Sequence, residues 1–275
     1  MLKQRIIAGV LAGVALLALL YLGSFFLMLL TVLVFSIFAY LEYDKLFFQN
    51  ASTVRRMRLA AMITLGILSL DQGGNMGWYW LWLTFIALSI WHIVALDHDG
   101  DFGSGIHRFA LEFFGYVYVI ALMGFLVPIA RVPTHGREYL LLLFLMVFIG
   151  DTSAYFAGMR FGKHPLAPKL SPKKTIEGAS AGMAASIIAS VAWYQFIYTG
   201  PHVPGFAVPL FLFVPLGSAL AQAGDLLESL LKRSQSQKDS GSFLPGHGGL
   251  LDRIDGLALV SPVFYFFIQL VLEHP

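Results

Sequence analysis

Long apolar runs constrain this chain more than any other feature. Runs of about 20 apolar residues recur along its length, separated by short polar stretches. Of the 275 residues, 57% are hydrophobic and 12% are charged, whereas about 25% of a soluble domain is charged. Inside a bilayer each backbone polar group must bond within the protein, and a helix achieves this. The sequence therefore predicts an all-α integral membrane protein, a polytopic helical bundle of about nine transmembrane helices. The expected spans are residues 6–22, 24–42, 58–71, 77–96, 109–130, 138–159, 178–198, 206–231 and 256–273.

The distribution of basic residues predicts an orientation for this bundle. With nine spans, sixteen of the 18 Lys and Arg residues fall on the side of the amino terminus, and only Arg131 and Arg137 fall on the other. Loops rich in Lys and Arg stay in the cytoplasm. We therefore expect a cytoplasmic amino terminus and an external carboxyl terminus. So uneven a count also supports an odd number of spans, because one missed span would invert every later loop.

The first apolar run has an alternative interpretation as a cleaved signal peptide. Lys3 and Arg5 precede an apolar stretch that ends near Leu20. The following residues 21–24 lack the small-residue pattern of a cleavage site, and hydrophobicity resumes at Phe25. A retained first helix is therefore the favoured interpretation.

The chain reads as a single membrane domain over residues 1–275. Gly9 and Gly13 in the first span, and Gly178 and Gly182 in the seventh, have the spacing that lets helix backbones approach closely. Packing within the chain is favoured for them, with a homodimer seam as the alternative. The absence of cysteine excludes disulfides, thiol nucleophiles and zinc–thiolate sites. Any metal must be held by oxygen or imidazole.

One polar segment, residues 229–255, stands out between apolar spans. It packs four basic residues, three aspartates, a histidine and a glycine-rich turn together, although charges near a bilayer centre are costly and usually functional. In the preceding span, Asp225, Ser229 and Lys232 share one helical face. The turn at residues 245–249 suits close approach to a phosphate, and Asp252 and Asp255 suit Mg²⁺.

A plainer interpretation of this segment is a solvated basic loop. Lys and Arg would then satisfy the orientation rule, and Asp252 would be a favourable charge at a helix start. That interpretation leaves Asp225, inside an apolar span, unexplained. Phosphate and metal binding is therefore favoured.

A second polar segment covers residues 151–177. It begins with Asp151 at membrane depth and carries four lysines spaced by Pro165, Pro168 and Pro172, which prevent a helix. On its own, such a loop is equally well explained by attraction to anionic headgroups.

The first segment resembles the signature of the phosphatidate cytidylyltransferases, also called CDP-diacylglycerol synthases. The second segment looks like the family's other characteristic stretch, at residues 171–178. Together they cover the carboxyl-terminal half, so residues 138–275 would hold the catalytic spans, while residues 1–130 carry no matched motif. The matching residues of the signature are Ser229, Lys232, Arg233, Lys238, Asp239, Pro245, His247, Gly248, Gly249, Asp252, Arg253 and Asp255.

The resemblance implies a bacterial inner-membrane enzyme that joins CTP and phosphatidic acid to give CDP-diacylglycerol and pyrophosphate, with Mg²⁺ required. Asp225, Asp252 and Asp255 would then hold the metal. His247, beside Gly248 and Gly249, would contact phosphate or nucleotide, and Lys173 and Lys174 would close the site from the other segment. The phosphate charges would be neutralised by Lys232, Arg233, Lys238 and Arg253.

Two other functions remain open at this point. A CTP-dependent polyprenol or lipid kinase would use similar residues but transfer the γ-phosphate. An ion or anion transporter would explain Asp151 and Asp225 inside spans, although the paired halves typical of transporters are not evident.

Overall fold

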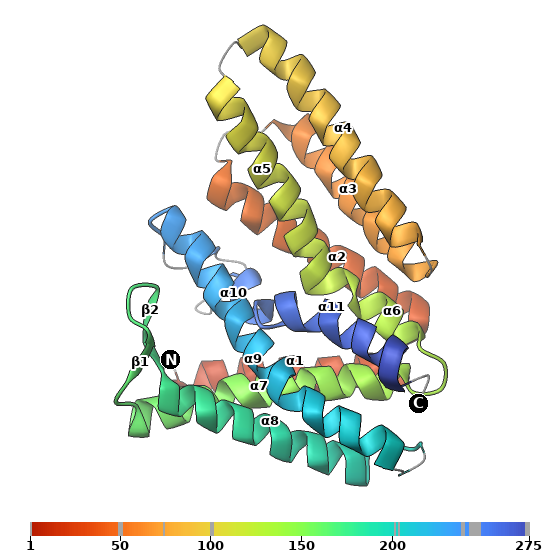
Figure 1. Ribbon diagram of the computed structural model, residues 1–275, viewed down its shortest axis with the longest axis vertical. Helices are drawn as coiled ribbons and strands as arrows, with labels where there is room; N and C mark the ends of the chain where they lie inside the picture. The colour runs from red at the N-terminus through yellow and green to blue at the C-terminus, as the bar shows by residue number, and fades with distance from the viewer. Residues whose placement is uncertain are drawn as a thin grey trace.

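A computed structural model describes residues 2–48, 52–73, 75–99, 102–200, 202, 204–237, 240–241 and 249–272. Helices make up almost all of this part of the chain, and one small hairpin interrupts them (Figure 1). The elements are α1 Leu2–Leu22, α2 Phe25–Phe47, α3 Thr53–Asp71, α4 Met76–Asp99, α5 Phe102–Val119, the π-helix η1 Ile120–Gly124, α6 Leu126–Arg131, α7 Gly136–Phe161, β1 Pro165–Ala167, β2 Ser171–Thr175, α8 Ile176–Phe196, α9 Pro204–Ser234, α10 Leu251–Ile254, α11 Leu257–Phe267 and the π-helix η2 Ile268–Leu272.

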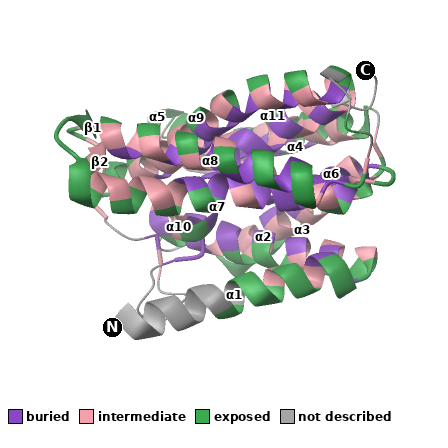
Figure 2. Ribbon diagram, turned by 90° about the horizontal axis from the view of Figure 1, so that it is seen from below, coloured by how far each residue is buried: buried purple, intermediate pink, exposed green. Residues whose placement is uncertain are grey.

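The all-α membrane architecture is confirmed. Six of the described helical segments are long and apolar enough to cross a membrane, and the segments Gly13–Leu22 and Leu257–Val271 are shorter apolar helices. Many large apolar side chains face outward, as along the outer side of α1 (Figure 2), which suits a lipid environment. Each expected span overlaps one or more described helical segments, but the first six residues of α3 include three arginines, and the count of nine stays a prediction.

The hairpin occupies the proline-spaced part of the second polar segment. Strands β1 and β2 pair antiparallel, with Pro165 opposite Thr175 and Ala167 opposite Ser171. The prolines prevent a helix, as predicted, and the short ladder gives the loop a defined shape. Thr175 then caps α8, because its hydroxyl accepts the Gly178 amide at 3.1 Å. The hairpin thereby leads directly into α8.

Helices α7 and α8 lie so close together that glycine is required between them. A Cβ on Gly178 would stand 2.7 Å from the Ala154 carbonyl oxygen, and one on Gly182 would stand 2.7 Å from that of Gly150. The Ser186 hydroxyl also donates to the Met146 carbonyl at 2.7 Å. The expected packing of Gly178 and Gly182 within the chain is confirmed, whereas the same expectation is wrong for Gly13, where a Cβ would meet nothing within 4 Å.

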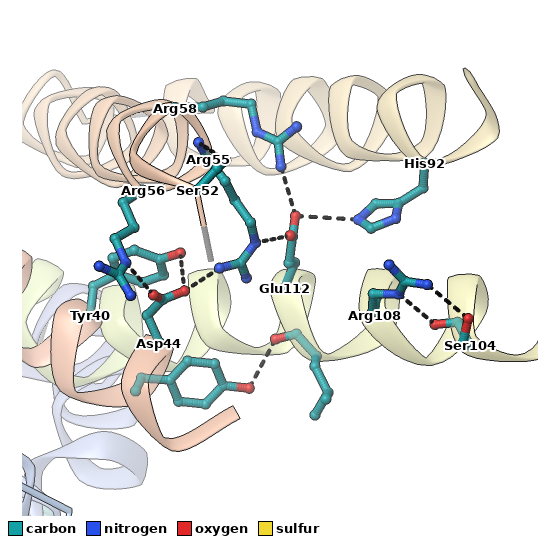
Figure 3. Close-up of polar contacts among 12 residues, drawn as sticks. Tyr40, Asp44, Ser52, Arg55, Arg56, Arg58, His92, Ser104, Arg108 and Glu112 are labelled. Atoms are coloured by element: carbon teal, nitrogen blue, oxygen red, sulfur yellow. Dashed lines mark hydrogen bonds and ion pairs between the residues drawn. The ribbon is translucent and has the colours of Figure 1, made fainter. Parts of the chain in front are cut away.

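The amino-terminal helices α2, α3, α4 and α5 share a buried network of charges (Figure 3). Asp44 at the end of α2 accepts hydrogen bonds from Arg55 and from Arg56, the latter at 2.8 Å. Glu112 of α5 pairs with Arg55 and, at 2.9 Å, with Arg58. Both carboxylates are almost completely buried, and His92 of α4 lies 3.3 Å from Glu112, so the network ties four helices together.

Helix α11 joins α9, in the carboxyl-terminal half, to the amino-terminal helices. It lies between α9 on one side and the α5–η1 segment on the other (Figure 1). Its Ser261 hydroxyl donates to the Ala121 carbonyl in η1 at 2.5 Å. Residues 251–256, which immediately precede α11, are thereby held near both α9 and the amino-terminal helices.

A larger residue at Gly182 should weaken the α7–α8 contact. Gly182→Val forces side-chain atoms against the Gly150 carbonyl and should destabilise the protein by about 1–3 kcal/mol. Gly13→Val is the matched control, because a Cβ there meets nothing within 4 Å. Melting in detergent, followed by fluorescence-detected gel filtration, measures both variants. Equal melting temperatures for them would contradict the packing role.

Candidate active site

Three carboxylates from two segments meet at the end of α9. The ligand oxygens of Asp225, Glu228 and Asp255 all lie within 4.8 Å of one another. Asp225 and Glu228 are three residues apart on α9 and share one face of it, whereas Asp255 lies between α10 and α11. We call these three residues the carboxylate cluster. It is the group of side chains best placed to bind a cation in the part of the chain that the structure describes.

Two glycines allow the segments of this cluster to approach each other. A Cβ on Gly224 would stand 2.5 Å from the carbonyl oxygen of Asp255, so α9 can touch the α10–α11 junction only at a glycine. At Gly256, a Cβ would stand 2.9 Å from Val147 and 3.4 Å from the Asp151 carboxylate. Close backbone contact therefore brings Asp255 between α9 and α7.

Two lysines balance the cluster. Lys174 of β2 reaches Asp225 with its Nζ 2.5 Å from Oδ2. Lys232, one turn along α9, lies 2.6 Å from Glu228. The Lys174 contact brings the second polar segment to the first, as the sequence predicted. The site therefore alternates acidic and basic groups from α9, β2 and the α10–α11 junction.

Asp255 is buried, with 8% of its surface exposed. Burial raises the pKa of Asp255 well above its ordinary value, and the neighbouring carboxylates of Asp225, Glu228 and Asp151 add to the rise. Its Oδ1 accepts the Gly256 amide at 2.8 Å, which partly opposes the rise. A carboxyl group in such surroundings favours a nearby cation, because a cation offsets the charge that burial penalises.

Asp252 has a different set of partners. Its Oδ1 lies 2.5 Å from Lys232. Its Oδ2 accepts the amides of Ser240 at 3.0 Å and Gly249 at 2.8 Å, and also the Ser240 hydroxyl at 3.0 Å. Burial alone would raise the pKa of Asp252, but Lys232 and these amides outweigh it and hold the pKa below its ordinary value.

The contacts of Asp252 define a loop clamp, consisting of Ser240, Gly249 and Asp252. The carboxylate joins Ser240 to Gly249, the last residue of the glycine-rich turn. The Gly249 amide, expected to face a phosphate, donates to Asp252 in this conformation. Metal binding by Asp252 stays a prediction, and the structure groups Glu228 with the other two expected ligands in its place.

The donor set of the carboxylate cluster fits a hard divalent cation. Its members offer only carboxylate oxygens, which Mg²⁺ prefers, and Mg²⁺ is typically held by one or two carboxylates plus substrate phosphates. The two lysines that pair with Asp225 and Glu228 show that positive charge is favoured beside these carboxylates.

The remaining predicted residues divide into two groups. Arg233, Arg253 and Lys173 are exposed, and Ser229 is partly buried on α9. Arg233 donates to the Gln237 carbonyl at 3.4 Å. The other predicted residues lie outside the described part of the chain: Lys238, Asp239, His247 and Gly248.

Sequence reasoning missed three residues of this region. Glu228 carried a signal, because it is acidic inside an apolar span and lies four residues before Lys232. Asp151 was recognised at membrane depth but not assigned to the site. Glu42 carried no local signal, although its carboxylate accepts the Leu251 amide at 2.9 Å.

The fold and the site together define a class: a polytopic helical membrane protein with a carboxylate and lysine site suited to a cation and to phosphate groups. Comparison with known proteins narrows this class. The model of the Cytidylyltransferase family matches residues 3–271. The chain belongs to the cytidylyltransferase family, as the two polar segments indicated.

Individual relatives agree with this assignment. The chain is 29% identical to the phosphatidate cytidylyltransferase of Bacillus subtilis (strain 168) over 276 residues, which is 98% of each protein. It is 39% identical to the protein of that name from Haemophilus influenzae over 144 residues, 51% of this chain and 49% of the relative. For that of Thermotoga maritima the identity is 36% over 161 residues, 56% of this chain and 57% of the relative.

Removal of the Asp252 charge should release the loop clamp. Asp252→Asn leaves one oxygen for two amides and a hydroxyl, and it removes the ion pair with Lys232. We expect faster limited cleavage by trypsin after Lys238 and Arg253 while the protein stays inserted. Asp71→Asn, which alters a carboxylate paired with Arg131, serves as the control. A digestion rate equal to wild type would contradict the clamp.

Proposed function

We propose that this protein transfers CMP from CTP to phosphatidic acid, giving CDP-diacylglycerol and pyrophosphate. The observation that carries the proposal is the meeting of both polar segments at the carboxylate cluster, through the Lys174–Asp225 contact. Membership of the cytidylyltransferase family and the names of its relatives support the same reaction. CDP-diacylglycerol is the product that enters phospholipid biosynthesis.

The chemistry is a substitution at phosphorus. An oxygen of the phosphatidate phosphate attacks the α-phosphorus of CTP, and the bond to the oxygen that bridges the α- and β-phosphates breaks. That oxygen leaves with pyrophosphate. A phosphate monoester has its second pKa near 6, so the attacking oxygen is largely ionised at neutral pH and needs no strong base. Positioning and charge neutralisation then account for catalysis.

The carboxylate cluster is the proposed holder of Mg²⁺, through Asp225, Glu228 and Asp255. When bound, the ion would neutralise phosphate charge and favour the departure of pyrophosphate. Asp252 stays a candidate ligand, but its contacts favour a role in holding the glycine-rich turn beside the cluster.

Basic residues around the cluster would receive the phosphates. Lys174 and Lys232 are ion-paired to the carboxylates, and both extend from elements that border the cluster. Arg233, Arg253 and Lys173 are exposed and are proposed to contact the triphosphate or the lipid phosphate. We propose further phosphate or nucleotide contacts for Lys238, Asp239 and His247, on the basis of the signature alone.

We also propose a location and an orientation. The protein would lie in the inner membrane of a bacterium, with the amino terminus and the site on the cytoplasmic side, where CTP is present. The distribution of Lys and Arg supports this orientation. The acyl chains of phosphatidic acid would stay in the bilayer. A homodimer stays a prediction.

Isotope position distinguishes the proposed reaction from lipid phosphorylation. Purified protein given phosphatidic acid, Mg²⁺ and CTP labelled in the α-phosphate should transfer label to the lipid fraction, read by thin-layer chromatography. Label in the γ-phosphate should leave as pyrophosphate, and chelation of Mg²⁺ should stop both. Lipid labelled only from γ-labelled CTP, with a polyprenol as acceptor, would establish a kinase instead. Turnover in detergent without any gradient would exclude transport as the function.

Substitution of Glu228 should reveal its proposed metal role. Glu228→Gln keeps the shape but removes one charge from the cluster. We expect the Mg²⁺ concentration for half-maximal activity to rise at least about tenfold, since even residues behind metal ligands change affinity by about 10–100-fold. Glu177→Gln is the control, because Glu177 binds the amides of Lys163 and His164 in the hairpin region. An unchanged Mg²⁺ requirement would remove Glu228 from the ligand set.

A further inference from the structure

A carboxylate from the amino-terminal half reaches the polar segment of residues 229–255, which we call the motif segment. Glu42 lies near the end of α2, in the part of the chain without a matched motif. Its Oε2 accepts the Leu251 amide at 2.9 Å, across 209 positions of sequence, and the Ser240 hydroxyl at 3.4 Å. Glu42 therefore contacts this segment at Ser240 and Leu251, one before and one after the glycine-rich turn.

The contact is tight enough to exclude other side chains. A Cβ on Gly249 would stand 2.6 Å from Glu42 Oε2, and one on Gly241 would stand 2.7 Å from Oε1. Glu42 itself is 6% exposed. A buried carboxylate is unfavourable unless hydrogen bonds or cations offset its charge. Its contacts with the turn therefore constrain where the backbone before Asp252 can lie.

The end of α2 that carries Glu42 is itself fixed. Two residues further along, Asp44 is fully buried and binds Arg55 and Arg56 of α3 (Figure 3). The Tyr43 hydroxyl donates to the Leu111 carbonyl of α5 at 2.9 Å. Three consecutive positions thus attach α2 to α3, to α5 and to the motif segment. Glu42 projects from a rigid support and not from a mobile helix end.

We propose that Glu42 is a positioning residue for the nucleotide site. It holds the backbone at Ser240, Gly249 and Leu251 so that Asp252 and Asp255 reach Lys232 and the carboxylate cluster. This inference rests on the proposed function, because it assumes that the cluster and its neighbours bind the CTP phosphates. It also gives the amino-terminal helices a part in catalysis that their sequence does not show.

Three variants test this role in the full-length protein. Glu42→Leu removes both acceptor oxygens at similar size. Glu42→Gln keeps one acceptor oxygen for Leu251 and Ser240, and places its amino group where Oε1 has no hydrogen-bond partner among the described residues. Glu138→Gln is the matched control, since Glu138 also accepts a backbone amide and a hydroxyl, both from Thr199, away from the cluster.

The expected result has a kinetic and a structural part. In Glu42→Leu, kcat/KM for CTP should fall by about 10–100-fold, as for residues that orient a site from behind, while KM for phosphatidic acid changes by less than about twofold. Hydrogen exchange at the Leu251 amide should accelerate on the order of fivefold, the equivalent of about 1 kcal/mol for one hydrogen bond. Glu42→Gln should restore both values to near wild type, and Glu138→Gln should match wild type.

Several outcomes would overturn the proposal. Unchanged exchange at Leu251 in Glu42→Leu would show that the contact does not hold the backbone. Equal loss of activity in Glu42→Gln and Glu42→Leu would show that the charge, and not the hydrogen bonding, is needed. Normal CTP kinetics in Glu42→Leu, with Asp255→Asn inactive, would reject the positioning role alone. Normal CTP kinetics in both Glu42→Leu and Asp255→Asn would reject the assignment of the site itself.

Discussion

The arrangement of the site depends on the ion pairs that the Lys232 ammonium group forms. This group lies between Glu228 on its own helix and Asp252 on the following segment, and all three side chains are mostly buried. Charges removed from water must be paired, and loss of one partner from a buried pair typically costs about 3–5 kcal/mol. The lysine therefore fixes the distance between α9 and α10. Asp252 extends that constraint to Ser240 and to Gly249, the last residue of the glycine-rich turn.

The same principle operates twice more in the molecule. Lys174 pairs with Asp225 and attaches the hairpin to α9. In the amino-terminal half, Arg55 pairs with both Asp44 and Glu112 and attaches α2, α3 and α5 to one another. Elsewhere the helices meet through glycines and apolar contacts, which determine how closely two helices pack but do not select particular partner residues. The ion pairs join specific residues and so fix how the helices are oriented relative to one another.

The sequence predicted those features that depend on local composition. Apolar runs indicated the helices, because spanning length and hydrophobicity are local properties. The prolines between 165 and 172 predicted a non-helical segment, and the glycines at 178 and 182 predicted close packing. Asp225 and Asp255 were expected to lie together, and they do. Each of these predictions needed only a few neighbouring residues.

Features that depend on a distant partner could not be predicted in the same way. Nothing near Glu42 indicates that Leu251 will lie beside it, because the contact exists only when α2 and the motif segment are packed. Asp252 and Asp255 are three residues apart and were expected to bind the same metal. In the structure Asp252 belongs to the loop clamp, whereas Asp255 belongs to the carboxylate cluster. Glu228 was available to reasoning from its spacing to Lys232, but its place beside Asp255 depends on the contact at Gly224.

The contact between Glu42 and Leu251 also bears on how the protein is made. A ribosome delivers the amino-terminal residues first, and chains begin to fold as they emerge. The helices around Asp44 and Glu112 contain their own partners, so they have what they need to assemble early. The Leu251 amide that pairs with Glu42 is synthesised 209 residues later, after nearly all of the remaining chain. A truncated chain that ends before α10 would therefore carry an assembled amino-terminal bundle in which the Glu42 carboxylate lacks its Leu251 partner.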